Sequence, residues 1–314
     1  MAQRRNSFKH PRRAGNGKRK LLLLVLAVLL VVIAVLFVLL DGLKKGRWGE
    51  RHPSPVVETH SMPQRGGADY PQGAYSSAQT SQPLPPKEKL APARHGKLAI
   101  IVDDMGSSMK DAERLLAIDI PLTFSVIPGL ANSRKVANAA HARGRGVMIH
   151  MPMEPQGYPG QRLESNGLLV SQGEGEITAR VEAYLKDVPH ATGANNHMGS
   201  GFTEHEDKMQ PVLEVLKKNG LYFVDSKTSS RSVGYPMAVR MGIQAGTRNV
   251  FLDNDQNVAK VKEQLAQAAT LAAKRGGVIA ICHPHAGTIQ ALEEMMPKLH
   301  KEGITFVTAA QIVR

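Results

Sequence analysis

Apolar residues form one long uninterrupted run near the start of the chain and recur in short blocks from residue 97 onward. The long run covers 21–40, which is 20 apolar residues in a row and enough to span about 30 Å of hydrocarbon as a helix. A cleaved signal peptide has a shorter apolar core, roughly 7–15 residues, followed by a small-x-small site. Because no such site follows residue 40, the pattern predicts an uncleaved transmembrane anchor.

The charges that flank this run predict its orientation. Residues 1–20 contain eight Lys or Arg and no acid, whereas Lys44, Lys45 and Arg47 follow the run. The larger positive charge remains on the cytoplasmic side, so everything after residue 41 is expected outside the cytoplasmic membrane. The basic arm also explains much of the net charge of +13. We therefore expect a lipid bilayer, and not nucleic acid, as the partner of the N-terminus.

Two further regions follow the predicted anchor. Residues 41–95 are rich in Pro, Ser, Gln and Gly, a composition typical of an extended linker. Residues 96–314 are long enough to bury a core without disulfides, and Cys282 is the only cysteine of the chain. Since Cys282 lies within an apolar block, we expect it to be a buried hydrophobic residue.

The apolar blocks of the last region alternate with amphipathic segments. The blocks predict strands within 97–104, 121–128, 146–152, 191–199, 221–226, 249–255, 277–285 and 304–309. The amphipathic segments predict helices within 107–118, 132–144, 176–188, 203–220, 258–276 and 288–303. Strands that are separated by helices indicate βαβ units and a parallel sheet. We therefore predict an α/β fold, a distorted (β/α) barrel of seven or eight mostly parallel strands.

Acidic, amide and imidazole side chains collect where these predicted strands end. They are Asp103, Asp104, His150, Glu154, Asn195, Asn196, His197, Asp225, His283 and His285. In a barrel the carboxyl ends of the strands converge on one face, so side chains from distant parts of the chain are expected to meet there. Asp253 and Asp255 also follow a strand, but their pattern is that of a turn entering a helix.

Adjacent carboxylates such as Asp103 and Asp104 need a cation, a shared proton or solvent. Two neutral imidazoles and one carboxylate are ligands that suit zinc or a similar divalent ion and leave positions open for water and substrate. We therefore predict one divalent metal, with Asp104 beside the cation and Asp103 free to act as a base. The alternatives are a helix-capping role for Asp104 and a core position for His150.

Six short motifs resemble the divergent polysaccharide deacetylase family, a distant branch of the polysaccharide deacetylase superfamily. In chain order they are IIVDDMG, FSVIPG, HMPMEP, NNHMGS, FVDSKTSS and CHPH, and the resemblance covers about residues 96–314. It implies a distorted barrel that holds one divalent metal and removes N- or O-acetyl groups from a polysaccharide. Outside the cytoplasmic membrane, in the periplasm of a cell with two membranes, that substrate would be an envelope glycan.

The resemblance also implies roles for individual residues. It makes Asp103 the base, Asp104 a metal ligand and His283 the group that assists the leaving group. His150 matches the first histidine of a metal-binding pair, but Glu154 occupies the second position, so His197 would supply the missing imidazole. The Arg-x-Pro-Tyr element of the superfamily has no clear match.

Three function classes remain open. The first is a metal-dependent deacetylase, with Glu154, Asn196, Asp225 and His285 near the substrate or behind the ligands. The second is an envelope glycan-binding or regulatory protein that kept the barrel and lost turnover, which the departures from the superfamily favour. The third is a metal-dependent hydrolase of another substrate, such as a phosphoester, for which Lys227 and Arg231 leave room for an anionic group.

Overall fold

The computed structural model describes residues 96–314. The predicted anchor at 21–40 and the linker at 41–95 lie outside the described residues. Within 96–314, no helix combines the length and the apolar sequence that a membrane span requires.

The described residues form one curled sheet in which every paired strand runs parallel to its neighbour. The strands are β1 (Lys97–Met105), β2 (Thr123–Val126), β3 (Gly146–Met153), β4 (Gly193–Met198), β5 (Tyr222–Asp225), β6 (Ala245–Thr247), β7 (Val250–Phe251), β8 (Gly277–Cys282) and β9 (Thr305–Val307). Eight of them follow the order β6-β5-β4-β3-β2-β1-β8-β7, and β9 pairs with β1. The sheet is therefore a barrel that does not close, since its two edges, β6 and β7, do not pair.

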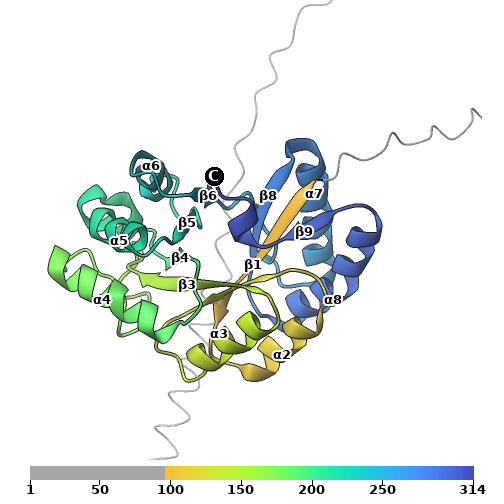
Figure 1. The fold of residues 1–314 in the computed structure, drawn as a ribbon, viewed down its shortest axis with the longest axis horizontal. Coiled ribbons are helices and arrows are strands. Elements are labelled where there is room, and N and C mark those ends of the chain that lie inside the picture. The colour runs from red at the N-terminus through yellow and green to blue at the C-terminus, as the bar shows by residue number, and fades with distance from the viewer. Residues whose placement is uncertain (1–95) are drawn as a thin grey trace, which may run out of the picture. The chain divides into compact units, whose positions relative to one another are not determined.

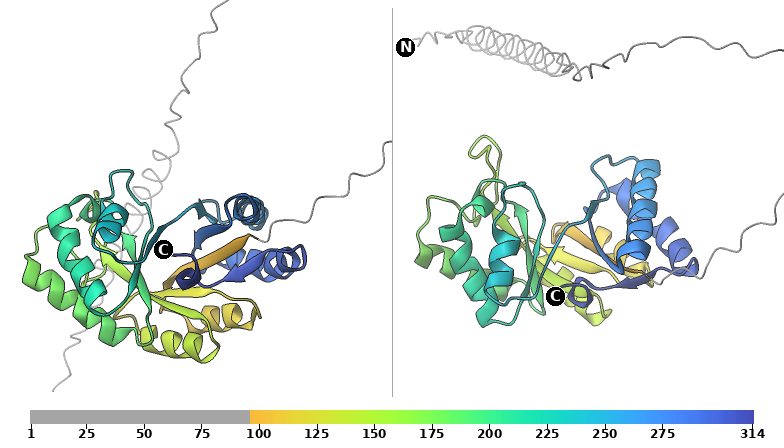
Figure 2. Two further views of the ribbon diagram at one scale, coloured as in Figure 1. Left: turned by 45° about the horizontal axis from the view of Figure 1, so that its top comes forward. Right: turned by 90° about the horizontal axis from the view of Figure 1, so that it is seen from above.

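Helices surround the outside of this curled sheet (Figure 1). They are α2 (Met109–Ala117), α3 (Ser133–Ala142), α4 (Glu174–Asp187), α5 (Glu206–Lys218), α6 (Gly234–Arg240), α7 (Val258–Arg275) and α8 (Ala286–Lys301). In both views of Figure 2 the green helices α4 and α5 lie on one side of the domain and the blue helices α7 and α8 on the other. Each crossover thus covers the outer face of the sheet, as parallel strands require.

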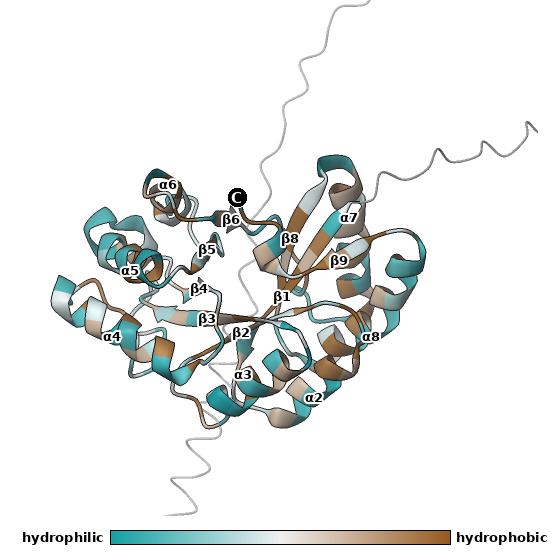
Figure 3. Cartoon of the chain, in the orientation of Figure 1, coloured by the Kyte–Doolittle hydropathy of each residue, from teal (hydrophilic) through white to brown (hydrophobic). Residues whose placement is uncertain are grey.

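The strands are buried on both faces, which explains their continuous apolar sequences (Figure 3). In β1, Leu98, Ile100 and Val102 belong to the large core between the sheet and the helices. Ala99 and Ile101 belong instead to a smaller core inside the barrel. Because side chains alternate along a strand, the next residue that points inside is Asp103, at the carboxyl end of β1.

The C-terminal segment fills the amino end of the barrel. Val307, Ala309 and Val313 belong to the interior core, and the backbone of Arg314 exchanges hydrogen bonds with Ala245 of β6. β9 pairs with the first half of β1, and β2 pairs with the second half on the same edge. One strand, β1, is therefore enclosed by segments from both ends of the domain.

All eight predicted strands are present, and the structure adds β6 with the short helix α6 before it. β6 is three residues, Ala-Gly-Thr, and offers no apolar block from which a strand could be predicted. The curled path contains eight strands, which agrees with the predicted count, and β9, which pairs with β1 off this path, is the ninth strand of the sheet.

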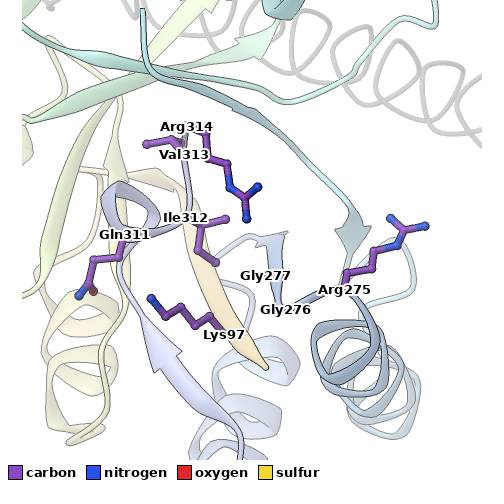
Figure 4. A pocket seen from close by; sticks show the side chains of 8 residues that line it. All are labelled: Lys97, Arg275, Gly276, Gly277, Gln311, Ile312, Val313 and Arg314. Atoms are coloured by element: carbon purple, nitrogen blue, oxygen red, sulfur yellow. The ribbon is translucent and has the colours of Figure 1, made fainter. Parts of the chain in front are cut away.

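A basic pocket lies at the amino end of the barrel, on the face away from the predicted site. Lys97, Arg275 and Arg314 line it together with residues of the last turn of the chain (Figure 4). It contains none of the predicted site residues, so the two ends of the barrel differ in their chemistry.

Candidate functional site

Both aspartates at the end of β1 turn toward the same cluster of side chains, although neighbours in a regular strand point to opposite faces. The strand register shifts between Val102 and Met105, and Asp104 has a φ of 55°. Asp is one of the few residues other than glycine that adopts this left-handed conformation readily. The kink brings the carboxylate of Asp104 beside the carboxylate of Asp103, which the strand directs into the barrel.

Three side-chain atoms from different strands meet next to this kink. Asp104 Oδ1 lies 2.9 Å from His197 Nδ1 and 3.2 Å from His150 Nε2, and the two imidazole nitrogens are 3.2 Å apart. The side chain of His150 is buried and that of His197 nearly so. One carboxylate and two imidazoles at such spacing are a donor set typical of zinc and similar divalent ions.

The state of Asp104 Oδ1 agrees with a cation site. This oxygen is buried, and within residues 96–314 it has no hydrogen-bond partner of good geometry. A buried carboxylate oxygen without a donor costs free energy, and a cation placed among the three atoms would remove that cost. Asp104, His150 and His197 therefore fit a divalent metal.

A buried amide fixes the orientation of His150. Asn195 Nδ2 donates to Asp103 Oδ1 at 2.9 Å, so the other amide atom, Oδ1, can only accept. It accepts from Ser125 Oγ at 2.6 Å and from His150 Nδ1 at 2.7 Å. Because Nδ1 of His150 carries the hydrogen, its Nε2 presents a lone pair to the cluster in the neutral ring.

His197 has its own support on the opposite side of its ring. Its Nε2 lies 3.6 Å from Glu164 Oε2, an oxygen that is buried and lacks a hydrogen-bond partner of good geometry among the described residues. A carboxylate behind the far nitrogen of a ligating histidine is a common second contact in metal sites. Glu164 therefore lies behind the ring nitrogen of His197 that faces away from Asp104.

The charges of the cluster favour a cation. Burial would lower the pKa of His150, but the nearby carboxylates of Asp103 and Asp104 outweigh it and raise the pKa to about 9. Burial would raise the pKa of Asp104, but its contacts with His150 and His197 hold it well below the usual range. For Asp103, which is almost entirely buried, burial dominates and raises the pKa.

A second histidine group lies beside the first. Asp253 Oδ2 accepts from the backbone N–H of His283 at 2.6 Å and from Thr288 Oγ1 at 3.0 Å, and Asp253 Oδ1 lies 3.2 Å from His283 Nδ1. Burial would lower the pKa of His283, but the interaction with Asp253 and the charges of Asp103 and Asp104 raise it. His285 is part of this group, and its Nε2 contacts Gln256 Nε2 at 3.1 Å.

Three of the predicted residues have other partners. The carboxylate of Glu154 accepts a hydrogen bond from Val170 N and so supports a loop. It is not part of the cluster of Asp104, His150 and His197. Asp225 accepts from Ser232 Oγ and from the backbone N–H groups of Lys227 and Tyr235.

Asn196 bonds Met198 O, Thr228 Oγ1 and Ser226 N. It therefore joins the loops after β4 and β5. Its neighbour Asn195 faces the cluster, because adjacent residues of β4 point to opposite faces.

Three further residues contribute side chains to the site. They are Asn195, Asp253, for which the sequence pattern predicts a turn, and Glu164, which lies outside every predicted strand. Strand alternation could have selected Asn195, since it is two residues before His197. The position of Asp253 directly after an apolar block was the same signal that singled out Asp103. Glu164 belongs to the long connection between β3 and α4 and carries no pattern that marks it.

We expect Asn195→Ala to lower the free energy of unfolding by about 2 kcal/mol, because it leaves buried donors and an acceptor without partners. Urea denaturation followed by circular dichroism measures this change. Ser125→Ala, which removes one hydrogen bond of the same amide, should cost about half as much. Equal stability of the Asn195→Ala variant and the parent would contradict the network described above.

Comparisons with known proteins agree with this architecture. The profile of the family described as divergent polysaccharide deacetylase matches residues 100–313. The uncharacterized protein YibQ of Escherichia coli K12 is 36% identical over 223 residues, which are 71% of this chain and 69% of that protein. An uncharacterized protein of Haemophilus influenzae is 32% identical over 206 residues, 66% of this chain and 73% of that protein.

Among solved structures, the uncharacterized protein ATU2773 of Agrobacterium tumefaciens C58 has a similar fold. Its TM-score is 0.66 at 22% identity, over 71% of this chain and 91% of that one. The resemblance that the six motifs indicated is thus confirmed by a profile that spans the whole barrel. The chain belongs to the divergent polysaccharide deacetylase family.

Proposed function

We propose that the protein is a metal-dependent hydrolase that removes acetyl groups from an envelope polysaccharide. The observation that carries the proposal is the trio of Asp104, His150 and His197, whose ligand atoms lie within 3.2 Å of one another around a carboxylate oxygen without a hydrogen bond. Membership of the divergent polysaccharide deacetylase family supports an acetylated glycan as substrate.

Asp104, His150 and His197 would hold the metal, with zinc the best match to two imidazoles and one carboxylate. When bound, the metal supplies Lewis acidity, which acidifies water and polarises a carbonyl group. The remaining chemistry falls to side chains that the metal leaves free.

Asp103 is placed to act as the base. Its Oδ1 is held by Asn195 Nδ2, and its Oδ2 lies 3.6 Å from His150 Nε2, so the carboxylate borders the metal position. It would accept the proton of the attacking water molecule. Asn195 bonds both this carboxylate and the His150 ring, so the base and the metal ligand are held at a fixed distance and orientation.

His283 is placed to act as the acid. Asp253 holds its Nδ1 side, which leaves Nε2 free to donate a proton to the departing amine or hydroxyl group. Base and acid then come from the carboxyl ends of two adjacent strands, β1 and β8.

The predicted anchor at 21–40 would tether the barrel to the cytoplasmic membrane, with the linker at 41–95 giving it reach. Residues 96–314 would then lie outside the cytoplasm, in the periplasm of a cell with two membranes. The apolar run and its flanking charges support both placements, which agree with an envelope glycan as substrate.

The test is made on the purified full chain. After reconstitution with zinc and dialysis, elemental analysis should find about one equivalent of metal. Acetylated glycan oligomers should release acetate with this protein, and a chelator should stop the release. Bound metal without acetate release from any acetylated glycan would favour the glycan-binding alternative, and no bound metal would overturn the proposal.

A further inference from the structure

A cavity of about 650 Å³ lies at the carboxyl ends of β5 and β7, where the barrel is open. Its lining includes three basic side chains, Lys227, Arg248 and Lys260, and a single acidic one, Asp255. Arg248 and Asn249 join the two unpaired edges of the sheet. The cavity therefore occupies the seam between β6 and β7, and its walls carry more positive than negative charge.

Arg248 is held in place without being neutralised. Its Nε donates to Ser226 O at 2.7 Å and its Nη2 to Lys227 O at 3.1 Å, and its guanidinium lies 5.0 Å from the centre of the Phe251 ring. No carboxylate of the described residues lies within ion-pair distance of it. These two backbone carbonyls accept from only part of the guanidinium and do not balance its charge, so a half-buried cation remains open to an anion.

The ion pairs around the cavity show which basic side chains have no carboxylate partner. Lys260 is paired with Glu263 at 3.0 Å, and Arg231, the other basic residue expected to face an anion, is paired with Glu204 at 2.7 Å. Lys227 forms no ion pair among residues 96–314. The uncommitted charges of this cavity are thus those of Lys227 and Arg248.

One aromatic ring separates this cavity from the proposed acid. Phe251 lines the cavity and meets His283 edge-on, with ring centres 5.4 Å apart. Burial lowers the pKa of Arg248, and the negative charges of Asp103 and Asp225 oppose this effect. A ligand in this cavity would therefore lie on the His283 side of the metal-binding cluster, with Phe251 between it and His283.

We propose that this cavity binds an anionic group, a carboxylate or a phosphate, that the substrate saccharide carries next to its acetylated sugar. Arg248 would supply directed N–H donors, and Lys227 a mobile positive charge. The inference rests on the proposed function for the acetylated neighbour, but the anion site itself needs no turnover. The expected substrate class is therefore an acidic acetylated glycan, which this cavity would bind more tightly than a neutral chitin-like oligomer.

The test is titration calorimetry of the full chain with three probes of equal length. They are a neutral N-acetylglucosamine oligomer, an oligomer that alternates N-acetylglucosamine with a uronic acid, and an N-acetylglucosamine oligomer that carries a phosphate. At least one anionic probe should bind about tenfold more tightly than the neutral one. The better of the two identifies the anion, carboxylate or phosphate.

Matched variants locate the binding. Lys227→Gln and Arg248→Lys should each remove most of the preference for the anionic probe. Arg275→Gln in the basic pocket at the amino end (Figure 4) and Lys298→Gln on α8 should leave it unchanged. The basic residues 1–20 are common to all variants, so their contribution cancels. Equal affinity for all probes, or loss of the preference only in Arg275→Gln, would overturn the inference.

The same variants separate this inference from the proposed function. Preference for the anionic probe that depends on Lys227, without acetate release from any probe, would leave the anion site intact and the deacetylase proposal refuted. Acetate release from neutral and anionic probes with equal KM, unaffected by Lys227→Gln, would support the deacetylase proposal and refute the anion site.

Discussion

Replacing Asp104 by asparagine is expected to leave the protein folded and without its metal. Asparagine has the shape of aspartate and, like aspartate, accepts a φ of 55°, the value at this position. It lacks the charge, and its amide would place N–H groups against the nitrogens of His150 and His197. Loss of Lewis acidity worth several kcal/mol corresponds to a fall in kcat/KM of about 10³-fold.

Metal content by elemental analysis, acetate release and circular dichroism measure the three parts of this expectation. Glu154→Gln is the matched control, because it removes a charge at the position where the superfamily has a histidine. Its amide oxygen can still accept from Val170 N, so we expect full metal content. The opposite pattern, metal lost with Glu154→Gln and kept with Asp104→Asn, would refute the assigned ligand set.

The second large effect is expected at His283. Removal of a general acid costs about 10²- to 10⁴-fold in kcat, so His283→Gln should lower the rate of acetate release by that factor. The metal content should be unchanged, since His283 is not one of the three proposed ligands, Asp104, His150 and His197. A variant that loses metal together with activity would instead make His283 a ligand.

The pH profile gives a readout specific to proton donation. A general acid must be protonated, so activity should fall as the pH rises through the pKa of His283, which lies above its ordinary value of 6.5. Asp253 helps to raise this pKa, so Asp253→Asn should move the alkaline fall to lower pH. In His283→Gln that limb should disappear, and an unchanged alkaline limb in both variants would assign it to another group.

Much of the fold could be predicted because it depends on apolar blocks. A strand covered by helices on one side and by the barrel interior on the other must be apolar throughout, and β1, β3 and β8 show this in the sequence. β6 depends on backbone pairing with β5 and the C-terminal segment. Backbone pairing of this kind does not produce a recognisable pattern in the three small residues Ala-Gly-Thr.

The candidate site could be predicted in outline, because polar residues at strand ends stand out against apolar blocks. The geometry that decides their roles is finer than this signal. The turn of Asp104 arises from one left-handed residue, and the choice between Asn195 and Asn196 depends on which face of β4 each occupies. The partners of Arg248 depend on how the edges of the sheet approach each other, which no local pattern contains.

The way residues 305–314 enclose β1 has a consequence for the order of folding. β1 begins the domain, yet its first half acquires its neighbour on one edge only when β9 arrives, some 200 residues later in the chain. Contacts of such long sequence separation slow folding, since the loop between them must be ordered before they form. During synthesis the interior would therefore remain open at its amino end until the last strand docks.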